Sequence, residues 1–219
     1  AAKLRPLGDF AATEAPGILI YANPGRFNSA QSAEIDSLQI TGASAGGGIY
    51  AAGNADYSII RNNKIRSNQG TLGGGITLGE GEQGVATNVG IQIRNNQILK
   101  NGGITAGGGI TIHSDATSYR VIDNLIMGNF TQWSGAGIAH YGLAMMDDIG
   151  NKIVFNEVFY GGQIGGDGGG IYVGSRVNPE DPGELDDGAG NVIIANNLIQ
   201  GNLAGSGFGG GICAMMMNG

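Results

Sequence analysis

The stretch Ile60-Arg-Asn-Asn63-Lys-Ile65-Arg-Ser-Asn68, with Gly73-Gly-Gly-Ile76 after it, decides the fold of this chain. Four further copies of the first element alternate with five further copies of the second. The other triplets begin at Gly46, Gly107, Gly135, Gly168 and Gly209, and alanine replaces the central glycine in the Gly135 copy. Alternating repeats of this kind predict a solenoid, in which each repeat forms one coil that stacks on its neighbours.

Aligning the copies places aliphatic residues in three columns, and every member is isoleucine or valine. The columns are Ile60, Ile93, Val121, Ile153, Ile194; Ile65, Ile98, Ile126, Val158, Ile199; and Ile49, Ile76, Ile110, Ile138, Ile171, Ile212. Because β-branched residues favour strands, three columns indicate three short strands per coil. We therefore expect an all-β fold, a right-handed single-stranded parallel β-helix of about six coils.

A column of asparagines lies between the first two aliphatic columns. Its members are Asn63, Asn96, Asn124, Asn156 and Asn197. Asparagine tolerates left-handed backbone at a corner, and its amide can bond to the amide on the next coil. Glycine permits tight bends and close packing of neighbouring backbones. We expect both the asparagine column and the glycine triplets to be structural.

The two ends of the chain depart from the repeat. The segment 16–21 predicts a strand, and Asn23-Pro24-Gly25 predicts a turn. We expect residues 1–34 to form a leading or capping segment and residues 35–219 to form the β-helix. The last coil ends soon after Ile212 and is expected to be incomplete. This predicts either continuation in a larger chain or end-to-end self-association.

The composition excludes several classes of protein. Glycine supplies 44 of the 219 residues, yet only five prolines are present, so collagen is excluded. The net charge of −7 argues against a nucleic-acid partner. No apolar run approaches the roughly 18 residues of a membrane-spanning helix, so no membrane span is expected. A single cysteine, Cys213, excludes an intramolecular disulfide framework.

All the insertions of variable length leave the repeat at one corner, and these insertions are acidic. They contain Glu80, Glu82, Asp115, Asp147, Asp148, Glu180, Asp181, Glu184, Asp186 and Asp187. Insertions on one face of a solenoid often mark its binding face. Clustered carboxylates can bind Ca²⁺, for which Glu80, Glu82, Asp147, Asp148, Asp181 and Asp186 are the candidate ligands. The alternative is an acidic, solvated edge that maintains solubility.

The glycine triplets and the Ile-x-x-Asn elements, such as Ile65–Asn68 and Ile98–Asn101, resemble the repeats of polymorphic outer-membrane autotransporter adhesins. More broadly, the chain is similar to the right-handed parallel β-helix group that includes pectate lyases. This resemblance implies an extracellular or cell-surface protein. The pectate-lyase analogy implies an arginine base, Arg94 or Arg120, beside bound Ca²⁺. The alternative is that these arginines pair with the acidic loops.

Two histidines remain for chemistry. Alternation places His140 inward, where a buried, hydrogen-bonded side chain is expected. His113 lies at the inserted corner near Asp115 and, one coil on, Tyr141, and is the best candidate for general acid–base catalysis.

The first expectation for the function is a structural or adhesive module that binds glycans or surface proteins along its acidic edge. The alternatives are a calcium-dependent polysaccharide lyase or hydrolase and a subunit of an end-to-end filament.

Overall fold

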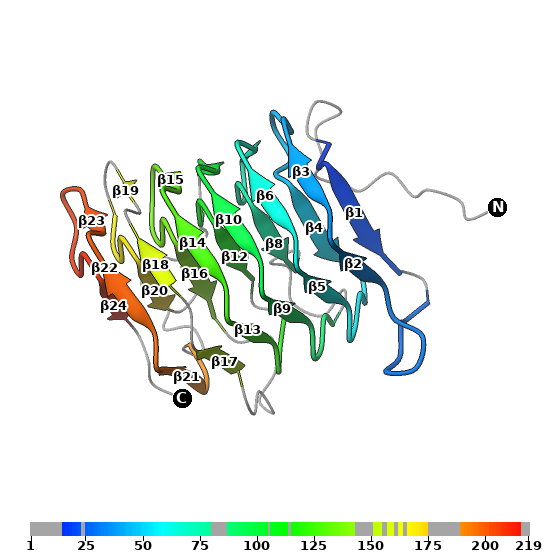
Figure 1. Cartoon of the computed structure of the whole chain (residues 1–219). Helices are drawn as coiled ribbons and strands as arrows, with labels where there is room; N and C mark the ends of the chain where they lie inside the picture. The colour runs from blue at the N-terminus through cyan, green and yellow to red at the C-terminus, as the bar shows by residue number, and fades with distance from the viewer. Residues whose placement is uncertain are drawn as a thin grey trace, which may run out of the picture.

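Each repeat of the sequence forms one coil of a parallel β-solenoid, and like strands of successive coils pair side by side (Figure 1). The computed structural model describes residues 15–22, 25–79, 87–104, 106–113, 115–142, 151–154, 157–159, 162–163, 166–174 and 189–215. Within these residues every regular element is a strand. The expectation of an all-β parallel solenoid is confirmed.

The strands form four sheets, numbered here in the order in which the chain visits them. Sheet 1 contains β1 (Ile18–Tyr21), β4 (Ile49–Ala52), β8 (Ile76–Leu78), β12 (Ile110–Ile112), β16 (Ile138–Tyr141), β20 (Ile171–Gly174) and β24 (Ile212–Met215). Sheet 2 contains β2 (Glu34–Asp36), β5 (Ile59–Arg61), β9 (Gln92–Arg94), β13 (Arg120–Ile122), β17 (Asn151–Val154) and β21 (Val192–Ala195).

The chain then turns twice more before it begins the next coil. Sheet 3 contains β3 (Gln39–Thr41), β6 (Lys64–Arg66), β10 (Gln97–Leu99), β14 (Leu125–Met127), β18 (Glu157–Phe159) and β22 (Leu198–Gln200). Sheet 4 contains β7 (Gln69–Gly70), β11 (Gly102–Gly103), β15 (Phe130–Thr131), β19 (Gly162–Gln163) and β23 (Leu203–Ala204). A coil therefore has four strands, and the prediction of three is wrong. The fourth strand spans only two residues.

The coils in which every strand has described side chains are fewer than the six coils expected from the repeats. These coils run from β1 to β15 and make about four turns, against the predicted six. Strands β16 to β24 continue the same order of sheets along the chain.

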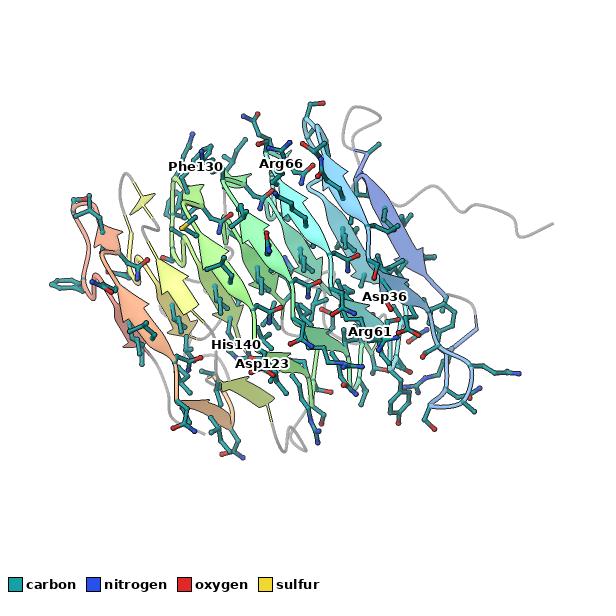
Figure 2. All side chains as sticks on the ribbon, viewed as in Figure 1. Asp36, Arg61, Arg66, Asp123, Phe130 and His140 are labelled. Carbon is teal, nitrogen blue, oxygen red and sulfur yellow. The ribbon has the colours of Figure 1, made fainter. Side chains whose placement is uncertain are left out.

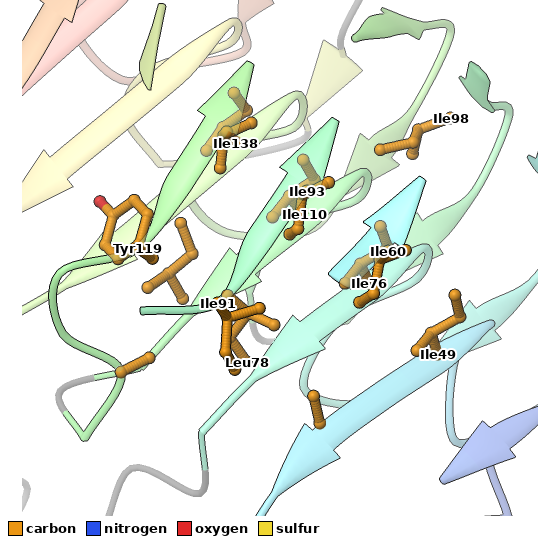
Figure 3. Close-up of a cluster of buried hydrophobic side chains, with 14 of the residues drawn as sticks. Ile49, Ile60, Ile76, Leu78, Ile91, Ile93, Ile98, Ile110, Tyr119 and Ile138 are labelled. Atoms are coloured by element: carbon orange, nitrogen blue, oxygen red, sulfur yellow. The ribbon is translucent and has the colours of Figure 1, made fainter. Parts of the chain in front are cut away.

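The three aliphatic columns stack in the core in the predicted register. Ile49 pairs with Ile76, Ile60 with Ile93, and Ile65 with Ile98. In the middle coils these side chains have no exposed surface, and they form the cluster shown in Figure 3. Stacking like side chains every ~4.8 Å leaves few voids, since each residue meets a neighbour of the same shape.

Two asparagine ladders define the corners on either side of sheet 3. In the first, Asn63 Nδ2 donates to Asn96 Oδ1 at 3.1 Å, and Asn96 Nδ2 donates to Asn124 Oδ1 at 3.0 Å. A second ladder, through Asn68, Asn101 and Asn129, has the same geometry at the next corner. The predicted bonding between amides of neighbouring coils is confirmed for these residues.

The left-handed backbone lies one residue earlier than predicted. Asn62 and Asn95, which precede the ladder residues, have φ of 55° each, and Asp123 has 56°. Their neighbours Asn63, Asn96 and Asn124 do not adopt positive φ. The physical reason is that the ladder side chain must point inward to reach the next coil, so the turn is made by the exposed residue before it.

The glycine triplets pack one coil directly against the next. A Cβ on Gly75 would lie 2.3 Å from the carbonyl oxygen of Gly109, and a Cβ on Gly109 would lie 2.5 Å from that of Gly137. Neither contact is sterically allowed, so the third triplet position requires glycine because of space. The triplets therefore fix the close approach of coils between sheet 4 and sheet 1.

The two ends of the described solenoid are formed by β1, at the start of sheet 1, and by β24, at its end. β1 lies within residues 1–34 and pairs with β4, so the solenoid sheet already begins at Ile18. In the last coil Ile212 belongs to the column of Ile49 and Ile76, yet it is 43% exposed, whereas those two are fully buried.

No helix among the described residues is long and apolar enough to cross a membrane.

Candidate functional site

A hollow of about 420 Å³ lies at the corner between sheets 2 and 3, where the first three coils meet. It is lined by Ser37, Leu38, Gln39, Asn62, Asn63, Lys64, Asn95 and Gln97. Five of these side chains, Gln39, Asn62, Asn63, Asn95 and Gln97, carry an amide, and Lys64 is the only charged one. The hollow is therefore equipped mainly with groups that both donate and accept hydrogen bonds.

The repeat itself builds this hollow. Residues with left-handed backbone, Ser37, Asn62 and Asn95, form one exposed column at the corner. The first outward residues of sheet 3, Gln39, Lys64 and Gln97, form a second column and pair in register. Because neighbouring coils are ~4.8 Å apart, the two columns present polar side chains at a regular spacing along the solenoid.

An ion-pair cluster borders the hollow on sheet 2. Arg61 pairs with Glu34, and its Nη2 lies 2.9 Å from Asp36 Oδ2 (Figure 2). Hydrogen bonds from Asn62 Nδ2 and from Ser37 Oγ, both 2.8 Å long, reach Asp36 Oδ1. These two bonds, and more weakly Arg61, hold the pKa of Asp36 below its ordinary value. The cluster thus fixes the Asn62 amide at the edge of the hollow.

The arginines suggested as a catalytic base lie on the outward face of sheet 2. Arg94 pairs with Arg61 on the preceding coil and with Ile122 on the next, whereas Arg120 pairs with Gln92. The two arginines therefore occupy different columns, on either side of the inward residue. The Arg94 Nε atom is buried, and no acceptor for its hydrogen bond occurs among the described residues.

His113 and Asp115 lie at the end of sheet 1. The His113 ring stacks on Tyr141 of the next coil, with 6.3 Å between ring centroids and 22° between planes. Burial, and the neighbouring Tyr172, raise the pKa of Tyr141 above its ordinary value. Tyr141 therefore stays neutral at physiological pH, and the predicted proximity of His113 to Tyr141 is confirmed.

Asp115 is buried, unlike a residue of a solvated acidic edge. Its Oδ2 accepts a 2.9 Å hydrogen bond from Asn88 Nδ2, and its carbonyl oxygen accepts one from the Asn88 backbone. The carboxylate lies over Gly79, where a Cβ would stand 2.0 Å from Oδ1. These contacts give Asp115 a structural role at the corner.

His140 is the buried histidine that alternation predicts. It pairs with Ile112 and Val173 in an otherwise aliphatic inward column. Its Nδ1 lies 3.0 Å from the Tyr119 hydroxyl, and its Nε2 lies 2.8 Å from the Ala189 carbonyl oxygen. Both ring nitrogens are therefore occupied by protein groups inside the core, and His140 is structural.

The suggested calcium ligands Glu80, Glu82, Asp147, Asp148, Asp181 and Asp186 lie outside the described residues. Within the part of the chain that the structure describes, no three histidine, cysteine, aspartate or glutamate side chains are grouped as metal ligands. The sequence alone does not indicate the amide-lined hollow, because alternation assigns its residues to solvent. The regular recurrence of exposed polar residues at Ser37, Asn62 and Asn95 is the signal that could have found it.

Comparison with known proteins gives no assignment. No protein-family model matches this chain, and no significant match is found among curated proteins or among solved structures. The resemblance to autotransporter adhesins and pectate lyases is therefore supported only in its coarsest part, the parallel β-solenoid.

Proposed function

We propose that this protein is a rigid structural or adhesive module that binds glycans at the hollow between sheets 2 and 3, with its site of action outside the cell or at the cell surface. The observation that carries the proposal is the set of amide side chains around the hollow. The expected acidic edge lies mostly outside the described residues, so the support comes from a different corner of the same coils.

The chemistry of the hollow suits sugar hydroxyl groups. Each hydroxyl both donates and accepts hydrogen bonds, and so does each side-chain amide of Asn62, Asn95 and Gln97. Lys64 is the only charge in the lining, which favours neutral or weakly anionic sugars over densely charged polymers. Leu38, also in the lining, is exposed and offers an apolar surface to the C–H groups of a sugar ring.

The fold holds these groups in place before any ligand arrives. Leu38 N donates to Asn63 Oδ1 at 3.0 Å, so the first ladder anchors the backbone beneath the hollow. Asn62 is held by Asp36 on the preceding coil. Binding to groups already ordered costs less conformational entropy than binding to mobile loops. A rigid solenoid therefore suits a module that must bind a long, flexible polymer.

The test removes two amides from the hollow while keeping the backbone. In the double variant Asn95→Gly/Gln97→Ala, glycine retains the left-handed conformation at position 95. Loss of two hydrogen-bonding groups at about 1 kcal/mol each predicts binding weaker by roughly 10- to 30-fold. The measurement is affinity electrophoresis, followed by calorimetry, with a panel of neutral and uronic-acid oligosaccharides.

The matched control is Asn196→Gly/Leu198→Ala, which changes the equivalent positions three coils further on. Asn196 also has positive φ, at 57°, and Leu198 is in register with the column of Gln97. The control should bind as the unmodified protein does. Equal weakening by both double variants, or binding of none of the oligosaccharides, would show that the hollow is not a glycan site.

A further inference from the structure

Phe130 of β15 presents a flat aromatic face to solvent. A Cβ built on Gly102, the paired residue of the preceding coil, would lie 2.3 Å from Phe130 Cζ and 2.7 and 2.8 Å from its two Cε atoms. These nearly equal distances place that Cβ above the ring face and not beyond the ring edge. The ring thus lies flat on the Gly102 backbone, and half of its surface, 50%, remains exposed.

Two further exposed apolar residues lie on the turns that follow β11 and β15. Ile104, two residues after Gly102, is 48% exposed, and Trp133, three residues after Phe130, is 61% exposed. Gln132 is exposed between Phe130 and Trp133. We call Ile104, Phe130 and Trp133 the apolar platform. The Gln132 amide therefore lies, in sequence, between the two aromatic residues of the platform.

The size of the platform decides what kind of partner fits it. A fully buried aromatic side chain contributes about 150–250 Å², so three residues exposed by about half offer roughly 300 Å². A stable protein–protein interface needs about 800 Å² from each partner. The platform is too small for that, but it matches a ligand with a flat apolar face and a polar rim, which describes a sugar ring.

The Phe130 ring belongs to the fourth coil and covers Gly102 of the third coil, which also supplies Asn95 and Gln97 to the hollow. Gln97 lines the hollow, and the chain continues through Leu99 and Asn101 to Gly102, beneath the Phe130 ring. Five residues at about 3.3 Å each give a path of roughly 16 Å or less. Figure 2 shows Phe130 at the opposite edge of sheet 3 from Asp36 and Arg61, which border the hollow.

From these observations we infer that the ligand is an oligosaccharide that lies across sheet 3, with one end hydrogen-bonded in the hollow and the other end stacked on Phe130. This inference rests on the proposed function and adds the length and direction of the ligand. A single sugar ring is too short to reach both places. A longer oligosaccharide gains affinity from the second contact, since the two contacts belong to one rigid surface.

The experiment compares glucose, as the monosaccharide, and cellotetraose, as the longer oligosaccharide, on four proteins. In the unmodified protein the oligosaccharide should bind at least tenfold more tightly than the monosaccharide. Phe130→Ala should abolish this gain and leave monosaccharide binding unchanged, whereas Phe130→Tyr should restore it. The chain contains one tryptophan, Trp133, so quenching of its fluorescence by the oligosaccharide is an independent readout.

Phe208→Ala is the matched control, because Phe208 is 76% exposed on a turn of the last coil. It should leave all affinities unchanged. If Phe130→Ala keeps the gain in affinity, or if Phe208→Ala removes it equally, the inference fails while the hollow can still be a glycan site. Binding of neither sugar overturns both proposals. Phe130-dependent binding to lipid vesicles in place of sugar also overturns the inference.

Discussion

His140 shows how a single polar side chain is accommodated in the core of this solenoid. Its column is otherwise aliphatic, and its two ring nitrogens meet the Tyr119 hydroxyl and the Ala189 carbonyl oxygen. Burial lowers the pKa of His140 from 6.5 to about 4, opposed by the hydrogen bond to Ala189. Between pH 6.5 and about 4 the folded protein therefore holds the neutral imidazole, while the unfolded chain binds a proton.

This difference predicts an acid-dependent loss of stability. Above pH 6.5 the histidine is neutral in both states, so its contribution is constant. As the pH falls from 6.5 to about 4, protonation favours the unfolded chain, and the free energy of unfolding decreases by up to about 3 kcal/mol. Below pH 4 the effect levels off. Urea denaturation at a series of pH values measures it.

The control for this prediction replaces Tyr119 and His140 together. In Tyr119→Phe/His140→Leu the hydroxyl and the imidazole are removed together, so that of this cluster only the Ala189 carbonyl oxygen loses a partner, and leucine suits a column that already contains Leu78. The part of the acid sensitivity between pH 6.5 and 4 that is due to His140 should disappear. An unchanged difference in stability between those two pH values would refute the assignment.

At the level of residues, sequence reasoning placed inward side chains correctly and outward ones only partly. His140 and the isoleucine columns follow from alternation, because an inward residue has one allowed face. Arg94 and Arg120 also point outward as predicted, yet they fall into different columns. Alternation alone gives only the outward face, but the aligned columns separate the two arginines, because Arg94 follows Ile93 whereas Arg120 precedes Val121.

At the level of elements, the glycine triplet acts as a spacer between coils. The third glycine approaches the carbonyl oxygen of the next triplet so closely that no side chain fits. Sequence reasoning identified this bend from its repetition. It did not find the short strands of sheet 4, since Gly102–Gly103 has neither alternation nor β-branched residues to indicate a strand.

This geometry predicts opposite outcomes for two glycine-to-alanine changes. Gly75→Ala would place Cβ 2.3 Å from the Gly109 carbonyl oxygen, and the resulting overpacking should destabilise the fold by about 1–3 kcal/mol. Gly162→Ala has no atom within 4 Å of its Cβ and no positive φ, so it should be neutral or stabilising by up to about 1 kcal/mol. Denaturant midpoints compare the two.

The prediction has a clear counter-result. If both variants unfold at the same denaturant concentration, the triplet glycines are required only for chain flexibility and not for the spacing of coils. If Gly75→Ala alone is destabilised, steric exclusion at the triplet accounts for its recurrence throughout the chain.

At the scale of the whole molecule, stability must depend on position along the solenoid. Each middle coil pairs with two neighbours, whereas the last described coil pairs with one. The exposure of Ile212 in a column of buried isoleucines reflects this difference. In stacked repeats the free energy is roughly a sum of nearest-neighbour terms, so the end coil should open more often than the middle.

Hydrogen exchange with mass spectrometry tests this gradient. Backbone amides of β8, β10 and β12 should exchange much more slowly than those of β22 and β24, because opening of the last coil breaks one coil interface and opening of a middle coil breaks two. Equal protection of the middle and the end would show that the end coil is covered by a partner or that the solenoid opens as a single unit.

The asparagine ladders have an electrical consequence. In both ladders the donor belongs to the earlier coil and the acceptor oxygen to the later one, as in Asn63 to Asn96 and Asn68 to Asn101. The side-chain amide dipoles therefore add along the axis, with their negative ends toward the first coil, much as peptide dipoles add in a helix. From Asn63 to Asn129, the two corners beside sheet 3 are therefore polarised along the axis of the solenoid.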